Sequence, residues 1–114
     1  MLCSQDAING YRIVWLYVMF DLPVETKAQR KRATRFRKDL LDDGFGMLQF
    51  SVYIRHCASY EAANVHIERV KLIIPDEGSV SILKVTDKQF EQTINFVGCR
   101  AKPPPKTPLQ LEFF

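Results

Sequence analysis

The stretch YRIVWLYVMFDLP, residues 11–23, decides the fold of this chain. Apolar side chains fill both of its alternating faces: Ile13, Trp15, Tyr17 and Met19 on one, and Val14, Leu16, Val18 and Phe20 on the other. A strand that is apolar on both faces is usually covered on both sides, so we expect it at the centre of a sheet. Pro23 cannot donate a hydrogen bond to a neighbouring strand, which predicts that the strand ends near Asp21.

Two helices are predicted downstream. Thr26 and Gln29 have the spacing of a capping box, and Gly44 is suited to a C-terminal cap, so the first helix lies between them. Ser59 predicts the cap of a second helix that runs to about Ile73. In the first helix, the inward face expected at helical spacing is Gln29, Ala33, Phe36 and Leu40, and Leu41 widens it. In the second helix, the expected apolar face is Ala63, Ile67, Val70 and Ile74.

Three further strands are predicted, at residues 45–55, 79–86 and 93–97. In the first of these, Leu48, Phe50, Val52 and Ile54 alternate with Gln49, Ser51, Tyr53 and Arg55, which predicts one core face and one more polar face. The linear order is therefore β-α-β-α-β-β. The ferredoxin-like order, β-α-β-β-α-β, is reached only if residues 45–55 bend into two strands or if the connections differ. The alternative is that residues 45–55 form one strand and that residues 93–97 close the sheet after a short link.

The composition changes after Gly98. Residues 101–108 read AKPPPKTP, which holds four prolines in eight residues and predicts a stiff, extended spacer over residues 99–108. The alternating segment LQLEFF at 109–114 is expected to be a strand that needs a sheet edge, and the spacer favours the edge of a partner chain. We therefore expect one domain, with residues 1–98 as core plus a short N-terminal extension, and a homodimer.

The chain has 114 residues, of which 46% are hydrophobic, so it can bury a core without disulfides. Its three cysteines are widely spaced and are expected to be free thiols in a reducing compartment. The longest apolar run is too short to cross a membrane and lacks the features of a signal peptide. These features predict a cytoplasmic protein with no membrane partner.

Positive charge is concentrated in the first predicted helix, although the net charge is only +3. Residues 27–38 contain seven lysines and arginines and no acidic residue. With the apolar face turned inward, the outward row suited to a phosphate backbone is Lys27, Lys31, Arg35 and Lys38, flanked by Arg30. Contacts of this kind do not depend on base sequence. The alternative is an ordinary solvated cationic face.

Four segments together resemble the small, second core subunit of the CRISPR adaptation machinery, in the form found beside type II systems. They are VMFDLPVET (18–26), GFGMLQFSVYIR (44–55), PDEGSVSILKVTDKQFE (75–91) and QLEFF (110–114). The resemblance implies an α+β, ferredoxin-like core and a homodimer whose C-terminal strand crosses to the partner. It also implies binding of double-stranded prespacer DNA and a bridge between copies of the CRISPR integrase.

Members of that family have also been assigned metal-dependent endoribonuclease or deoxyribonuclease activity, so RNA is a second possible substrate. The resemblance implies that Asp21 is the metal ligand and catalytic residue, with Mg²⁺ as the cofactor and Mn²⁺ as the alternative. One carboxylate holds Mg²⁺ poorly, so a two-fold axis near Asp21 would have to bring two copies together. The alternative is that Asp21 only caps the helix region that follows or forms a hydrogen bond with its own backbone.

The two histidines, His56 and His66, do not have metal-ligand spacing and are expected to be structural. Gln49, Ser51 and Tyr53 are expected at the dimer interface or near Asp21. A different class of function is a ferredoxin-like RNA-binding module without catalysis, which would stack bases on aromatic side chains of its sheet. No aromatic motif of that kind occurs on a central strand.

Overall fold

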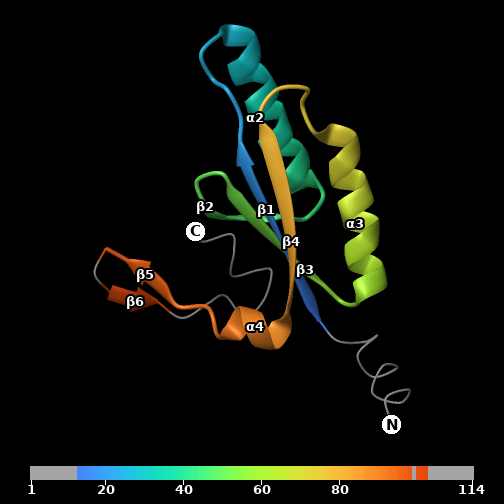
Figure 1. Ribbon diagram of the computed structural model, residues 1–114, viewed down its shortest axis with the longest axis vertical. Helices are drawn as coiled ribbons and strands as arrows, with labels where there is room; N and C mark the ends of the chain where they lie inside the picture. The colour runs from blue at the N-terminus through green and yellow to red at the C-terminus, as the bar shows by residue number, and fades with distance from the viewer. Residues whose placement is uncertain (1–12, 99, 103–114) are drawn as a thin grey trace.

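The computed structural model describes residues 13–98 and 100–102, with the backbone alone described at 100 and 102 (Figure 1). Its elements are β1 (Val14–Asp21), α2 (Lys27–Asp42), β2 (Gly46–Gln49), β3 (Val52–Cys57), α3 (Tyr60–Ile73), β4 (Ser79–Thr86), α4 (Asp87–Glu91), β5 (Asn95–Val97) and β6 (Arg100–Lys102). In this part of the chain no helix is long and apolar enough to cross a membrane.

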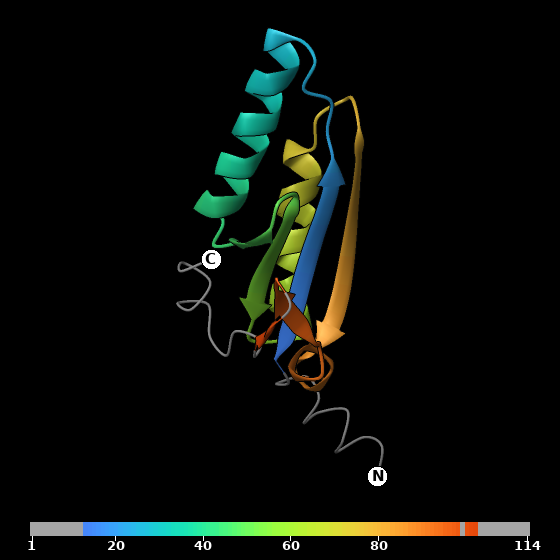
Figure 2. The same cartoon turned by 90° about the vertical axis from the view of Figure 1, so that its left-hand side faces the viewer.

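The main sheet has the strand order β2-β3-β1-β4, and every neighbouring pair is antiparallel. The first six elements therefore follow the order β-α-β-β-α-β, which confirms the ferredoxin-like, α+β prediction. Helices α2 and α3 both pack against one face of the sheet (Figure 2). The short helix α4 packs against the other face through Phe90.

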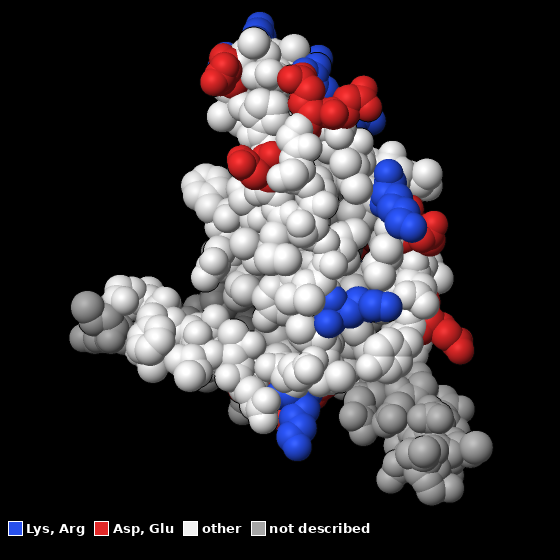
Figure 3. All heavy atoms as spheres, in the orientation of Figure 1, with Lys and Arg blue, Asp and Glu red and all other residues white. Residues whose placement is uncertain are grey.

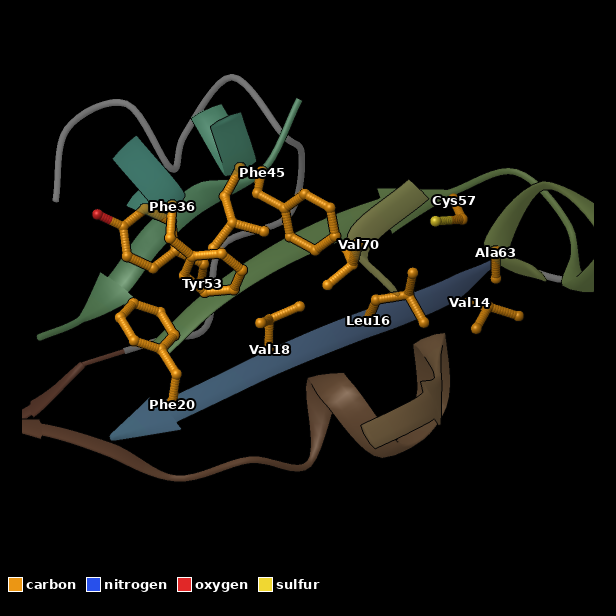
Figure 4. Close-up of a cluster of buried hydrophobic side chains, with 11 residues drawn as sticks. Val14, Leu16, Val18, Phe20, Phe36, Phe45, Tyr53, Cys57, Ala63 and Val70 are labelled. Atoms are coloured by element: carbon orange, nitrogen blue, oxygen red, sulfur yellow. The ribbon is translucent and has the colours of Figure 1, made fainter. Parts of the chain in front are cut away.

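Strand β1 is central, as its apolar pattern predicts. Val14, Leu16, Val18 and Phe20 point into the main core beneath the two long helices, where they meet Phe36, Leu40, Phe45, Tyr53, Cys57, Ala63 and Val70 (Figure 4). On the other face, Trp15 stacks on Phe90 with ring centroids 3.9 Å apart and packs against Ile54. Burial of both faces fixes the register of β1 between β3 and β4.

The predicted ends of both long helices are confirmed. Thr26 and Gln29 form a reciprocal capping box at the start of α2, and Ser59 accepts a hydrogen bond from the Ala62 N–H at the start of α3. Gly44 has φ +92°, the left-handed conformation expected just beyond the end of α2. The prediction for Leu41 is wrong: its side chain is 52% exposed, because the buried face of α2 runs through Ala33, Phe36 and Leu40.

Residues 45–55 do not form one strand. The chain turns at Phe50 and Ser51, so that β2 and β3 pair as a hairpin, and Ser51 adopts φ +65°. The turn reverses part of the predicted alternation. Phe50 is 86% exposed instead of buried, and Tyr53 is 3% exposed, buried under the long helices instead of on the outer face.

The alternative in which residues 93–97 close the main sheet is wrong. β5 instead pairs with β6 in a separate two-stranded sheet, which extends away from the main sheet in Figure 1. Helix α4 follows β4 directly and carries the chain across the end of the sheet before β5 begins. The predicted strand at 109–114 and most of the predicted spacer lie outside the described residues.

A polar cluster ties the C-terminal end of α2 to α3 and β3. Asp43 lies directly after α2, and its carboxylate is 2.8 Å from Nδ1 of the buried His66 and 2.9 Å from an Nη of Arg69. Its backbone oxygen accepts a hydrogen bond of 2.7 Å from Arg55 Nε. One residue therefore fixes the relative positions of three elements through its side chain and its carbonyl group.

We expect Asp43→Ala to lower the free energy of unfolding by about 2 kcal/mol, because the buried His66 loses a charge-assisted hydrogen bond. Arg69 should contribute little, since its side chain is 60% exposed. Asp42→Ala is the matched control, because Asp42 is exposed and should change stability by less than about 0.5 kcal/mol. Urea unfolding followed by circular dichroism measures both; equal losses would contradict the assignment.

Candidate nucleic-acid and metal site

Asp21 is the last residue of β1, and its side chain is exposed. The strand that carries it is held by β3 on one side and by β4 on the other, where Asp21 lies opposite Ser79. A rigid central strand therefore fixes the backbone of Asp21 while leaving its carboxylate accessible. This position agrees with the sequence-based expectation of an aspartate presented at the end of a central strand.

Gly78 permits the turn before β4 to pass close to Asp21. Its φ is +92°, and a Cβ atom at this position would lie 2.6 Å from the backbone oxygen of Asp21 and 2.9 Å from the side chain of Leu22. Real Cβ atoms essentially never approach other atoms so closely. A side chain here would therefore have to displace the end of β1.

The residues that the structure describes do not form a metal site within one chain. Among them, no three histidine, cysteine, aspartate or glutamate side chains lie together in a group that could hold a metal ion. Acidic atoms gather at the end of the molecule where α2 begins (Figure 3). Of the acidic residues near this end, Glu77 is already engaged: it binds Arg32 at 2.6 Å and Gln29 at 3.1 Å. A single chain thus offers Asp21 as one carboxylate and does not fit Mg²⁺ by itself.

Neither histidine can assist Asp21 as a general base. His56 lies opposite Trp15, six positions from Asp21 along β1 and so about 20 Å away at ~3.3 Å per residue. Burial lowers the pKa of His56. The negative charge of Asp87 acts in the opposite direction, and the positive charge of Arg55 lowers the pKa further. His66 is committed to Asp43, at the end of α2 farthest from Asp21. These positions agree with the expectation that His56 and His66 are structural residues.

The other perturbed groups are buried side chains. Burial raises the pKa of the Cys57 thiol, opposed by the nearby Arg55, so this residue behaves as a small apolar side chain. Burial also raises the pKa of Tyr17, and a hydrogen bond with Thr93 acts in the opposite direction. Burial raises the pKa of Tyr53 in the same way, and the positive charge of Arg37 acts against it. Tyr53 therefore places a neutral phenol in the core instead of the expected position beside Asp21.

The predicted row of cations lies on the exposed side of α2. Lys27, Lys31 and Lys38 are exposed and have no carboxylate within 4.0 Å among the described residues. Arg35 lies 3.9 Å from Asp39, but its side chain is 81% exposed, so this pair neutralises little of its charge. These four residues, the outer row, follow the helix for 11 residues, about 16 Å at ~1.5 Å per residue.

Arg30 is held differently from the outer row. Its guanidinium donates to the backbone oxygens of Val24, at 3.1 Å, and Glu25, at 2.9 Å. These acceptors are neutral, so Arg30 keeps its charge while its position is fixed beside the start of α2. It also lines a groove with Leu22, the residue after Asp21. Of the predicted cations, Arg30 is therefore the one that the structure places beside the strand end carrying Asp21.

Sequence analysis missed two residues of this region, the half-buried Arg37 and the exposed Phe50. Both line the same groove as Arg30. Phe50 was expected in the core because the β2–β3 turn lacks the glycine or asparagine that usually marks a hairpin. The sequence shows Arg37 as one of the seven cations of residues 27–38 but assigns it to no surface, because only the fold shows which side of α2 meets the hairpin.

Comparison with known proteins places the chain in one family. Residues 14–93 match the family described as CRISPR associated protein Cas2. The chain is 49% identical over 107 residues to the CRISPR-associated endoribonuclease Cas2 of Flavobacterium psychrophilum, covering 94% of this chain and 93% of that protein. It is 48% identical over 101 residues to the protein of the same name from Parvibaculum lavamentivorans, covering 89% of this chain and all of that protein.

Replacement of Gly78 tests the close approach beside Asp21. We expect Gly78→Ala to lower the free energy of unfolding by about 2 kcal/mol or more, because the new Cβ meets backbone as well as adopting a left-handed φ. Gly98→Ala is the control: its φ is +65°, but nothing lies within 4 Å, so only the cost of the left-handed φ, at least about 1 kcal/mol, is expected. Thermal unfolding compares them, and equal costs would contradict the contact.

Proposed function

The chain belongs to the CRISPR-associated protein Cas2 family, and on that premise we propose that it acts in spacer acquisition as a homodimeric scaffold for double-stranded prespacer DNA. In this role it bridges copies of the CRISPR integrase. Metal-dependent hydrolysis of phosphodiester bonds at Asp21 accompanies that role. The observation that carries the proposal is the outer row of α2, whose cations face solvent and are largely free of carboxylate partners.

The geometry of the outer row suits a phosphate backbone. Its side chains are long and flexible and lie along one side of a straight helix, so they can meet successive phosphates without reading bases. Glu77 removes Arg32 from this surface by pairing with it at 2.6 Å. Lys27, Lys31, Arg35 and Lys38 therefore form a continuous cationic row without Arg32, and a dimer would present two such rows.

Uncovered apolar surface supports a homodimer. Ile94, Phe96 and Val97 are 74%, 63% and 63% exposed, and the last two lie in β5, which extends away from the main sheet. Figure 3 views the molecule from the side on which the strands lie in front of α2. Few charged atoms cover the middle of that face. Leu83 on β4 is 48% exposed, beside the half-buried Tyr17. A second copy is the partner that this proposal assigns to these surfaces.

Relatives named as endoribonucleases support the hydrolytic part of the proposal. Since the described residues of one chain hold no cluster of three metal ligands, Asp21 of two copies would have to converge to hold Mg²⁺ or Mn²⁺. The ion would supply a Lewis acid and an activated water for phosphodiester hydrolysis. The chain's own contribution is to fix Asp21 on a rigid strand, with Arg30 nearby to bind the substrate phosphate.

A plain RNA-binding module has less support from the sheet. Modules of that class expose aromatic rings on their central strands. Here Trp15 and Tyr53 are buried, and Tyr17 packs toward Phe90 with ring centroids 6.2 Å apart. RNA nevertheless remains a candidate substrate for cleavage, because phosphate contacts do not exclude it.

Charge reversal tests the outer row. We expect Lys27→Glu/Lys31→Glu to weaken binding of blunt duplex DNA about tenfold or more, because phosphate contacts are lost. The slope of log affinity against log salt concentration should also fall, by about 1 for each lost contact. Lys71→Glu/Lys88→Glu makes the same change in net charge on α3 and α4 and should have a much smaller effect. Fluorescence anisotropy measures all three proteins; equal weakening by both double variants would show a general charge effect.

Asp21→Ala separates hydrolysis from binding. We expect it to abolish metal-dependent cleavage of RNA and DNA while leaving the affinity for duplex DNA within about twofold, since Asp21 lies outside the outer row. Labelled substrates with Mg²⁺ or Mn²⁺ provide the cleavage assay, and spacer acquisition with the cognate integrase shows whether cleavage is needed. Cleavage that survives in pure Asp21→Ala protein would remove Asp21 from the proposed chemistry.

A further inference from the structure

A large apolar side chain stands uncovered at the C-terminal end of α3. Leu72 is 86% exposed, the same as Phe50 and more than any other large apolar side chain among the described residues. Val70, two positions earlier, is buried in the core, so Leu72 faces away from the sheet. A single exposed leucine is common on protein surfaces and indicates nothing by itself. Its surroundings distinguish this one.

Leu72 lines an open groove between α2 and the end of α3. The groove has a volume of about 520 Å³, and its wall on the side of α3 is apolar, formed by Leu72, Ile73 and Pro75. Ile73 and Pro75 are half-buried, so together with Leu72 they offer a continuous apolar surface instead of one isolated methyl group. Both long helices cover the same face of the sheet (Figure 2), so this groove opens on the helical side of the molecule.

The opposite wall of the groove is cationic. Lys31, Arg32 and Arg35 line it and lie three and four residues apart, which places them on one side of α2. Arg32 is paired with Glu77 at 2.6 Å, whereas Lys31 has no carboxylate within 4.0 Å among the described residues. Asp39, the acidic residue of the lining, is 3.9 Å from Arg35, whose side chain is 81% exposed. Two cations therefore remain available beside the apolar wall.

The two walls select a ligand that is both anionic and apolar. The backbone of a DNA duplex would satisfy Lys31 and Arg35 but offers no apolar group to cover Leu72 and Ile73. An amphipathic helix with acidic and apolar side chains would satisfy both walls, since grooves between helices bind such segments through apolar anchors. Its carboxylates would complement the cations of α2, which favours its approach over that of a basic segment.

A second copy of this chain is a less suitable occupant. The exposed Leu83 and its neighbour Tyr17 lie on the other face of the sheet, and β5 lies outside the main sheet. The proposed homodimer uses these apolar surfaces and leaves the groove between α2 and α3 open.

We propose that this groove docks an acidic, amphipathic helix of a different protein, whose apolar side chains contact Leu72 and Ile73 and whose carboxylates pair with Lys31 and Arg35. The inference goes beyond the proposed function, which requires no such partner. Lys31 and Arg35 also belong to the outer row, so the acidic helix and duplex DNA exclude each other there. A partner of this chemistry would therefore regulate access of DNA to α2.

The test uses a fluorescein-labelled synthetic peptide of about 18 residues, long enough to form a helix, with leucines along one face and glutamates elsewhere. We expect wild type to bind it, and we expect unlabelled peptide to displace blunt duplex DNA. Leu72→Ala should weaken peptide binding about fivefold or more, the effect of removing an apolar anchor at an interface. The affinity of Leu72→Ala for the duplex should stay unchanged, because Leu72 lies outside the outer row.

Two further variants and a second peptide complete the experiment. Phe50→Ala is the matched control and should bind the peptide as wild type does, since Phe50 is also 86% exposed but lines a different groove. Arg35→Gln should weaken binding of both peptide and duplex, and it tests the same groove if Leu72→Ala folds poorly. A peptide of the same composition with its leucines scattered around the helix should bind less tightly.

Several results would overturn the docking site. Equal binding of the scattered peptide, or unchanged peptide affinity in Leu72→Ala, would reduce the interaction to charge attraction. A change in the molar mass of Leu72→Ala, measured by light scattering, would assign the groove to contact between chains. Binding to phosphatidylglycerol vesicles that requires Leu72, without peptide binding, would assign it to a membrane surface. Duplex binding without peptide binding would remove the docking site and leave the proposed function, whereas peptide binding without duplex binding would do the reverse.

Discussion

The structure depends on the burial of β1 on both faces. Its even-numbered side chains fill the core beneath α2 and α3, and Trp15 on its other face stacks on Phe90 of α4. A shift of one residue would exchange these two sets, so the register with β3 and β4 is strongly specified. Asp21 is the first residue of β1 whose side chain leaves the protein interior. A central, buried strand of the sheet therefore delivers the candidate catalytic group to the surface.

Sequence analysis predicted the parts of the fold that local chemistry determines. The capping box of Thr26 and Gln29, the cap at Ser59 and the left-handed Gly44 each satisfy backbone groups within a few residues, so their signals can be read directly. The hairpin at Phe50 and Ser51 could not be predicted, because serine rarely adopts a positive φ and the hydrogen bond that joins this turn to the end of β1 is a tertiary contact. The position of β5 could not be predicted either, because helix α4 lies between β4 and β5 and β5 pairs with β6 outside the main sheet.

The same distinction applies to the candidate site. The sequence shows seven cations in residues 27–38, but it does not show which of them are neutralised. Folding places Glu77, from the turn before β4, against Arg32 and leaves Lys27 and Lys31 free of carboxylate partners among the described residues. It also separates Arg30 and Arg37 from the outer row and places both beside Phe50. One helix thus presents two cationic surfaces with different neighbours, and only the tertiary contacts distinguish them.

The central claim is that two chains must meet before Asp21 can hold a metal ion, since the described residues of one chain offer no cluster of ligands. The most direct measurement is a titration with Mn²⁺, in which electron paramagnetic resonance counts free ions and light scattering gives the molar mass. Our account predicts one tightly bound Mn²⁺ for every two chains, and loss of that ion in an Asp21→Ala protein that still forms dimers. One ion per chain, no bound ion, or binding unchanged by Asp21→Ala would contradict it.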